Sequence, residues 1–170
     1  MFRLSRSVLD ALGAVVRLGL AAVFLVSGAI KVLDPAQTRV AVGGYELLPA
    51  DLVGPVATGL PLVELAVGTL LVLGATTRWV ALAAGVLLLM LMAAVAQAWA
   101  RGLSIDCGCF GGGGAVATGD TRYPQELARD AGFVLLAVWL LMRPRTALSI
   151  DSWIRAGSRS GWGRAGHPAG

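Results

Sequence analysis

The sequence predicts an all-α integral membrane protein: a four-helix bundle with both termini in the cytoplasm and a cysteine-containing loop outside the membrane. Of its 170 residues, 56% are apolar and only 14% are charged. Soluble domains are usually about 45–50% apolar and about 25% charged. The apolar residues also gather in stretches close to the ~20 residues that a helix needs to cross a bilayer. The composition therefore excludes an ordinary soluble enzyme and a disordered chain.

Four stretches are expected to cross the membrane, at about residues 12–32, 53–73, 80–100 and 124–142. The fourth is the weakest, because only residues 131–142 are continuously apolar and the stretch has to carry Arg129 and Asp130. Pro124 suits the first position of this helix. A cleaved signal peptide is the competing interpretation of the first stretch. It is disfavoured because the apolar run is long and Lys31 follows it at once.

The distribution of Lys and Arg predicts the orientation of these stretches. With the N-terminus inside, the cytoplasmic parts hold eight Lys or Arg and the outer loops hold four, a bias that places both termini in the cytoplasm. Trp79 and Trp99 flank the third stretch, as interfacial aromatic residues do. We therefore expect one transmembrane domain over residues 1–145 in the plasma membrane. Residues 146–170 are expected to form a disordered cytoplasmic tail rich in Arg and Gly.

The outer loop holds both cysteines, in the run Asp106-Cys107-Gly108-Cys109-Phe110-Gly111. A disulfide that closes so small a ring constrains the unfolded chain by only ~1.6 kcal/mol, before any strain is subtracted. The spacing therefore favours an exchangeable, redox-active pair, with Gly108 supplying an unusual backbone conformation. Asp106 disfavours a thiolate and nearby arginines favour one. A structural bridge and a metal site remain alternatives, although two thiolates need further ligands and this side offers no other Cys or His.

Charged residues inside the apolar stretches also call for partners. Glu64 lies near the centre of the second stretch, where an ionised acid costs ~2.5–3.5 kcal/mol. We expect it to pair with Arg129 of the fourth stretch, whereas Arg17 is near enough to the cytoplasmic face to extend into water. Lys31 marks the outer end of the first stretch. Asp130 is expected to cap its helix or to meet Lys31.

These motifs resemble a known group of proteins. Ser27-Gly-x-x-Lys31 and Pro61-Leu-Val-Glu64 are similar to the DoxX-like group of small four-helix membrane proteins. The Cys107-Gly-Cys109-Phe-Gly motif, followed by Glu126-Leu-Ala-Arg129-Asp130, resembles the MauE branch, the methylamine utilisation protein, over about residues 10–145. The resemblance implies a membrane protein of the cell envelope that serves the processing, transport or disulfide maturation of the methylamine dehydrogenase small subunit. It also implies a thioredoxin-like companion of the MauD type.

Two functional hypotheses follow. In the first, the protein is a thiol–disulfide oxidoreductase, in which Cys107 and Cys109 exchange electrons with an extracytoplasmic thioredoxin-like protein or a client redox enzyme. Gly108, Arg129, Glu64 and Lys31 would support them. A quinone cofactor is suggested only by analogy with four-helix proteins of the DsbB type, and would be expected near Arg129 and Gln97. In the second, the protein is a non-catalytic scaffold or assembly factor with a structural CxC loop. Nucleic acid is not an expected partner.

Overall fold

The computed structural model describes residues 6–108, 111–117 and 119–144. Cys109 and the predicted tail at 146–170 lie outside these residues. The described chain is mostly helical, and its elements in order are α1 (Arg6–Leu33), α2 (Pro35–Gly44), α3 (Ala50–Leu73), α4 (Thr77–Ala100), β1 (Ile105–Asp106), β2 (Gly114–Ala115) and α5 (Tyr123–Met142). Helices α1, α3 and α4 contain the first three predicted stretches, and α5 covers the fourth.

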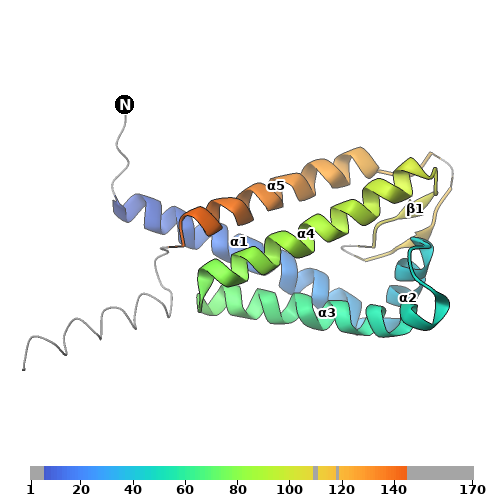
Figure 1. Ribbon diagram of the computed structural model, residues 1–170, viewed down its shortest axis with the longest axis horizontal. Coiled ribbons are helices and arrows are strands. Elements are labelled where there is room, and N and C mark those ends of the chain that lie inside the picture. Colours follow the sequence, from blue (N-terminus) through green and yellow to red (C-terminus); the bar gives the residue numbers. More distant parts are fainter. Residues whose placement is uncertain (1–5, 109–110, 118, 145–170) are drawn as a thin grey trace, which may run out of the picture.

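Helices α1, α3, α4 and α5 run lengthwise, and α2 and the two strands lie at one end (Figure 1). Helix α1 packs chiefly along α3, and α4 packs chiefly along α5, whereas α3 and α4 touch over a smaller part of their length. Helix α2 and the β1–β2 hairpin lie together at one end, and the start of α1 and the end of α5 lie at the other (Figure 1). The main core lies between the long helices and includes Leu20, Phe24, Leu71, Leu88 and Leu140.

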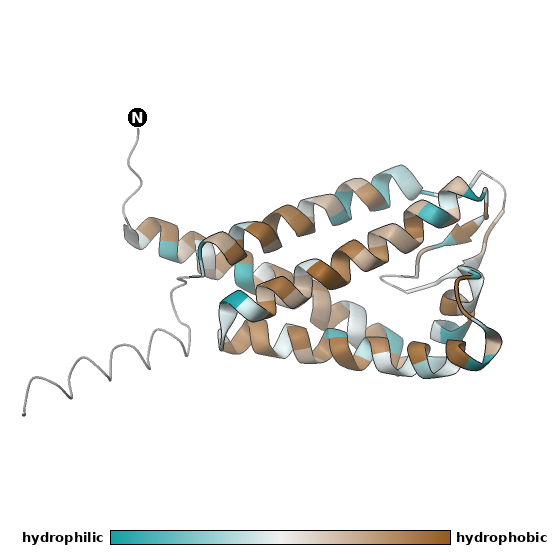
Figure 2. Cartoon of the chain, in the orientation of Figure 1, coloured by the Kyte–Doolittle hydropathy of each residue, from teal (hydrophilic) through white to brown (hydrophobic). Residues whose placement is uncertain are grey.

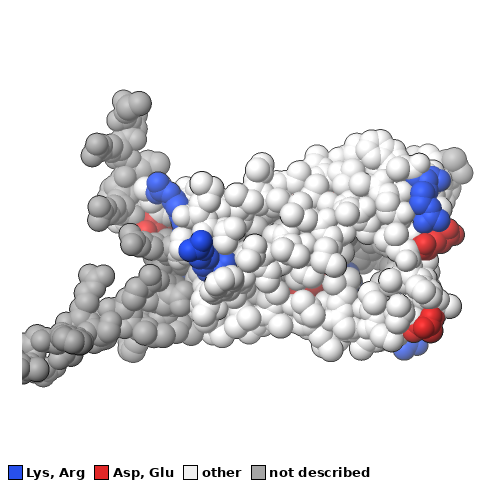
Figure 3. Space-filling view, in the orientation of Figure 1, with Lys and Arg blue, Asp and Glu red and all other residues white. Residues whose placement is uncertain are grey.

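The surface along the helices is apolar. Many large apolar side chains point outward, among them Leu62, Leu89 and Leu135, which are 56%, 53% and 70% exposed. Brown, apolar residues dominate the long helices in Figure 2, and in Figure 3 the charged side chains on the visible face gather toward its two ends. Soluble monomers rarely expose so large an apolar area. Three helices, α1, α3 and α4, are long and apolar enough to cross a membrane, which indicates a lipid bilayer as the environment.

Helices α1 and α3 approach each other closely at two glycines. A Cβ on Gly28 would lie 2.9 Å from Leu65 Cγ, and a Cβ on Gly68 would lie 2.8 Å from Leu25 Cγ and 3.1 Å from the Leu25 backbone nitrogen. Small residues at such contacts let helix backbones pack without a gap, which is the usual source of helix association in lipid. This close packing fixes how α1 lies along α3, and so determines which of their side chains meet.

Two elements at the end of the bundle were not predicted. Asp34 ends α1 and begins α2, because its Oδ1 accepts a hydrogen bond from the Gln37 backbone nitrogen at 3.0 Å and Pro35 follows as the first residue of α2. Proline is favoured at this position and cannot continue the preceding helix. The β1–β2 hairpin pairs Ile105 with Ala115 and Asp106 with Gly114. The expected all-α chain therefore carries a small hairpin, and this hairpin contains the cysteine motif.

The glycine contact between α1 and α3 predicts the effect of adding one methyl group. Gly68→Ala should destabilise the folded protein by about 1–3 kcal/mol, because its Cβ would enter the space held by Leu25. Gly59→Ala is the matched control in the same helix, because a Cβ at that position would have no atom within 4 Å. Thermal unfolding in detergent measures both variants, and equal loss in the two would contradict this packing.

Candidate functional site

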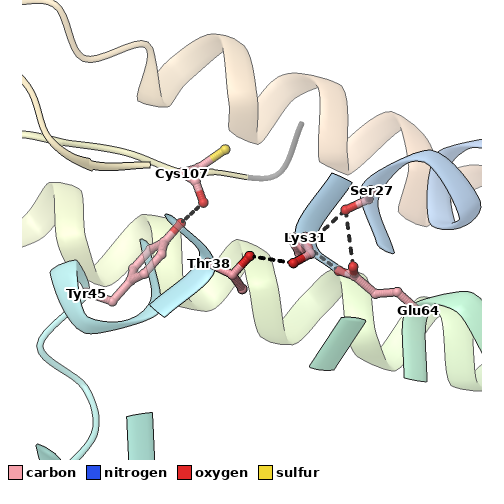
Figure 4. Close-up of polar contacts among 6 residues, drawn as sticks. All are labelled: Ser27, Lys31, Thr38, Tyr45, Glu64 and Cys107. Atoms are coloured by element: carbon pink, nitrogen blue, oxygen red, sulfur yellow. Dashed lines mark hydrogen bonds and ion pairs between the residues drawn. The ribbon is translucent and has the colours of Figure 1, made fainter. Parts of the chain in front are cut away.

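Cys107 lies just after β1, at the end of the bundle that carries α2. Its side chain is buried among Val95, Ala98 and Tyr123. Its backbone carbonyl accepts a hydrogen bond from the Tyr45 hydroxyl at 3.0 Å (Figure 4). Because Tyr45 follows the last residue of α2, this bond ties the cysteine to α2 as well as to the hairpin.

The hairpin is fixed against its neighbours by side-chain hydrogen bonds to backbone groups. Gln37 Nε2 of α2 donates to the Gly113 carbonyl at 2.7 Å. The hydroxyl of Tyr123, the first residue of α5, donates to the Leu103 carbonyl at 2.6 Å and accepts from the Ile105 backbone nitrogen at 3.1 Å. The strand that precedes Cys107 is therefore held by α5, and the strand after the motif is held by α2.

Glycine is required where the hairpin meets α2. Gly108 and Gly113 have φ angles of +66° and +102°, which favour glycine. A Cβ on Gly108 would lie 3.0 Å from the Cβ of Ala41, and a Cβ on Gly113 would lie 2.5 Å from it. The expectation that Gly108 supplies an unusual backbone conformation is thus confirmed, and the structure adds a steric reason for it.

Two carboxylates surround the sulfur of Cys107. Single donor atoms of Asp106, Cys107 and Glu126 all lie within 4.8 Å of one another. Burial raises the pKa of Glu126, while a side-chain hydrogen bond to Cys107 opposes that rise; the nearby Asp106 raises the pKa further and Arg129 lowers it. Glu126 lies in the first turn of α5, in its polar part, ahead of the apolar residues 131–142. The sequence left open whether acids or arginines dominate around the thiol, and at Cys107 two acids are the immediate neighbours.

The same three side chains form a set of donors that can hold a cation. Only Cys and His were considered as further ligands from the sequence, so Asp106 and Glu126 were missed in this role. One thiolate and two carboxylates supply three of the four ligands of a tetrahedral zinc site. Metal binding therefore stays an alternative to redox chemistry at Cys107.

Glu64 pairs with Lys31 and not with Arg129, so the predicted Glu64–Arg129 pair is wrong. Lys31 Nζ lies 2.6 Å from Glu64 Oε1, with the two side chains 10% and 1% exposed. Ser27 joins them: its hydroxyl lies 2.9 Å from Lys31 Nζ and donates to Glu64 Oε2 at 3.3 Å (Figure 4). The close contact of α1 with α3 at Gly28 explains this choice, because it brings the end of α1 directly over Glu64.

Arg129, Asp130 and Arg17 have partners other than those expected from the sequence. Arg129 Nε donates to Asp130 Oδ1 at 3.0 Å, so Asp130 pairs with its neighbour and not with Lys31. Arg17 is 1% exposed and donates to the Leu71 and Val72 carbonyls at the end of α3. The expectation that it extends into water is therefore wrong. Its charge meets the negative end of the α3 dipole, where cations are favoured.

A cavity of about 420 Å³ lies between the ion pair and the cysteine. Its lining includes Lys31, Asp34 and Thr38 near the junction of α1 and α2, Cys107 and Gly108 of the hairpin, and apolar side chains of α3 and α4. Neither Gln97 nor Arg129, where a cofactor was expected, lines it. Gln97 instead donates to the Tyr45 carbonyl at 3.1 Å.

Comparison with known proteins identifies the family. Residues 9–143 match the family described as methylamine utilisation protein MauE. The chain belongs to the MauE family. No curated protein and no solved structure matches it.

The family match covers the residues of the candidate site. The matched residues contain Lys31, Glu64 and the whole cysteine hairpin, and the resemblance drawn from the cysteine motif is confirmed. This MauE family member is a membrane protein associated with methylamine utilisation, with three apolar helices of membrane-spanning length. Glu126 was quoted in the motif but given no role, because its contact with Cys107 joins residues from separate elements.

The buried ion pair predicts a difference between two substitutions at one position. Glu64→Lys would place two ammonium groups together out of water and should abolish folding, since removing one partner of a buried pair already costs about 3–5 kcal/mol. Glu64→Gln keeps a hydrogen-bond acceptor for Lys31 and should be tolerated better.

The yield and thermal stability of the purified protein measure this difference. Glu46→Lys is the control, because Glu46 pairs with Arg101 at an exposed site where such pairs contribute about 0–1 kcal/mol. Equal yields of Glu64→Gln and Glu64→Lys would show that no cation lies beside Glu64.

Proposed function

We propose that this MauE family member carries out thiol–disulfide exchange on the extracytoplasmic side of the plasma membrane. Cys107 and Cys109 cycle between dithiol and disulfide and exchange electrons with a thioredoxin-like protein or a client enzyme. The observation that carries the proposal is the Glu126 carboxylate, which lies within 4.8 Å of the Cys107 sulfur and hydrogen-bonds to it, in a hairpin that Gln37 and Tyr45 hold in place. A thiol that merely holds a loop in shape does not need a proton acceptor.

Glu126 moves the proton in this scheme. A partner thiolate attacks the Cys107–Cys109 disulfide at Cys109, and Cys107 leaves as a thiolate that takes a proton from Glu126. A second partner thiolate then attacks the partner sulfur of the mixed disulfide and displaces Cys109, which takes its proton from water, so the partner gains a disulfide and both cysteines end as thiols. In the reverse direction Glu126 accepts the proton of Cys107. Attack falls on Cys109 because Cys107 is only 9% exposed.

The supporting residues act through position. Gly108 permits the turn between the two cysteines, and Lys31 and Glu64 hold α1 against α3 beneath the hairpin. Arg129 lies close enough to Glu126 to act on its charge. It favours the carboxylate form, which is the form that accepts a proton from Cys107.

The topology needed for this function is also a proposal. With α5 as a fourth membrane crossing, both termini lie in the cytoplasm and the hairpin lies outside. The Lys and Arg distribution supports this orientation, and the hairpin lies at the opposite end of the bundle from the start of α1 and the end of α5 (Figure 1). Disulfides form and persist outside the cytoplasm. Within the pathway of the family, a protein that matures the methylamine dehydrogenase small subunit fits this chemistry.

The exchange scheme predicts which cysteine variant traps its partner. In the reverse direction Cys109 attacks the disulfide of the partner and Cys107 resolves the product, so Cys107→Ser should accumulate a mixed disulfide through Cys109. Cys109→Ser should accumulate much less, because the remaining sulfur is buried. Non-reducing electrophoresis of intact cells, followed by mass spectrometry of the shifted band, identifies the partner. A folded Cys107→Ser/Cys109→Ser protein that still supports growth on methylamine would instead establish the scaffold function.

The role of Glu126 predicts a pH dependence that needs no partner. In a Cys109→Ser protein, alkylation of Cys107 by a maleimide should slow as the pH falls through the pKa of Glu126. Since burial raises that pKa above its ordinary value of 4.5, the midpoint of the decline should lie above pH 4.5. Glu126→Gln should lower the rate by about 10²-fold or more and remove this decline.

Glu46→Gln is the matched control at the same end of the molecule, because Glu46 is exposed and contacts Arg101. It should keep the rate and the profile unchanged. A Glu126→Gln protein with the parent profile would remove Glu126 from the mechanism. If added Zn²⁺ blocks alkylation of Cys107 in the parent but not in Glu126→Gln, the metal site is favoured.

A further inference from the structure

The cavity beside Cys107 opens sideways, between α3 and α4. These two helices contact each other over only a small part of their length, and the cavity is lined by both. Figure 3 shows a hollow in this lateral face, near the end that carries α2 and the hairpin, with charged atoms visible inside it. Because α3 and α4 are helices of membrane-spanning length, a side opening between them faces lipid, and a ligand can enter from the bilayer.

The walls of the cavity are apolar. Helix α3 contributes Val56 and Leu60, and α4 contributes Leu87, Met90 and Leu91. Met90 is 64% exposed, so its flexible side chain can move to admit a ligand. The volume of about 420 Å³ lies within the range of about 300–1,000 Å³ typical of small-molecule sites. Such walls suit a lipid-soluble ring with an apolar tail.

The polar end of the cavity selects a neutral hydrogen-bond acceptor. Lys31 lines this end, and its ammonium has three N–H groups, of which two contact Ser27 and Glu64. Among the described residues the third has no partner. Glu64 offsets the charge of Lys31, and Asp34, which also lines the cavity, adds a negative charge. An anionic headgroup is therefore disfavoured, whereas a carbonyl oxygen can accept the third N–H.

We propose that this cavity binds an isoprenoid quinone from the bilayer, with one ring carbonyl at Lys31 and the ring beside Cys107. The inference rests on the proposed exchange function and names its membrane-side electron acceptor. In the step, the Cys107 and Cys109 thiols form one S–S bond and release two electrons and two protons. The quinone takes up both electrons and both protons, one on each carbonyl oxygen, and leaves as the hydroquinone.

Photolabelling tests quinone binding separately from thiol chemistry. The protein is reconstituted in phosphatidylcholine vesicles as the Cys107→Ser/Cys109→Ser variant and labelled with an azido derivative of a short-chain benzoquinone. Ala94→Trp fills the cavity, because Ala94 lines it. Ala93→Trp is the matched control on the next residue, which is exposed and outside the lining.

We expect saturable labelling of cavity residues that unlabelled short-chain quinone displaces. Binding should weaken about tenfold or more in Ala94→Trp, which is about 1.4 kcal/mol, and stay unchanged in Ala93→Trp. Labelling that does not saturate, or that is equal in both variants, overturns the inference. Stronger displacement by oleate than by quinone overturns it in favour of an anionic lipid. Labelling that fails while Cys107→Ser still traps a thioredoxin-like partner refutes the quinone alone and leaves the exchange function intact.

Discussion

The absence of water inside a bilayer is the constraint on which this structure depends. Glu64 cannot remain ionised there without a partner, and the structure supplies Lys31 at 2.6 Å, with Ser27 completing the contact. The pair requires α1 to lie close on α3, and Gly28 and Gly68 make that approach sterically feasible. Replacing the pair by apolar residues need not destabilise the protein. Its consequence is positional, because it fixes where α1 ends relative to α3.

The position of α1 on α3 determines the arrangement at the end of the molecule that carries α2 and the hairpin. Asp34 and Pro35 turn the chain into α2, and α2 then provides the surface on which the hairpin rests. Gln37 of α2 and Tyr45, the residue after α2, each donate a side-chain hydrogen bond to the backbone of the hairpin. Cys107 thereby lies between a pair of carboxylates on one side and an apolar cavity on the other. The proposed exchange uses the carboxylates beside this sulfur, and the proposed quinone site uses the cavity.

Much of this architecture could be predicted from the sequence, and the parts that could not share one cause. Long apolar runs identify α1, α3 and α4, since hydropathy depends on composition alone. The cysteine motif can likewise be recognised in the sequence, and it indicates the family. The partner of Glu64 was missed because Lys31 and Arg129 both lie within reach along the helix axis, and only the distance between helices decides between them. Glu126 was given no role for the same reason: its contact with Cys107 joins separate elements. Helix α2 was foreseeable, because Asp34-Pro35 is a capping signal.

Thiol–disulfide exchange by this protein can be tested through the redox potential of the cysteine pair in native membranes. Membranes are equilibrated in thiol–disulfide buffers of graded potential, and the fractions of reduced and oxidised pair are read by mass shift after alkylation. An exchangeable pair should show a reversible two-electron transition above about −300 mV, the level below which structural disulfides usually lie, in protein that stays folded. A pair that no buffer reduces until the helices unfold would contradict it.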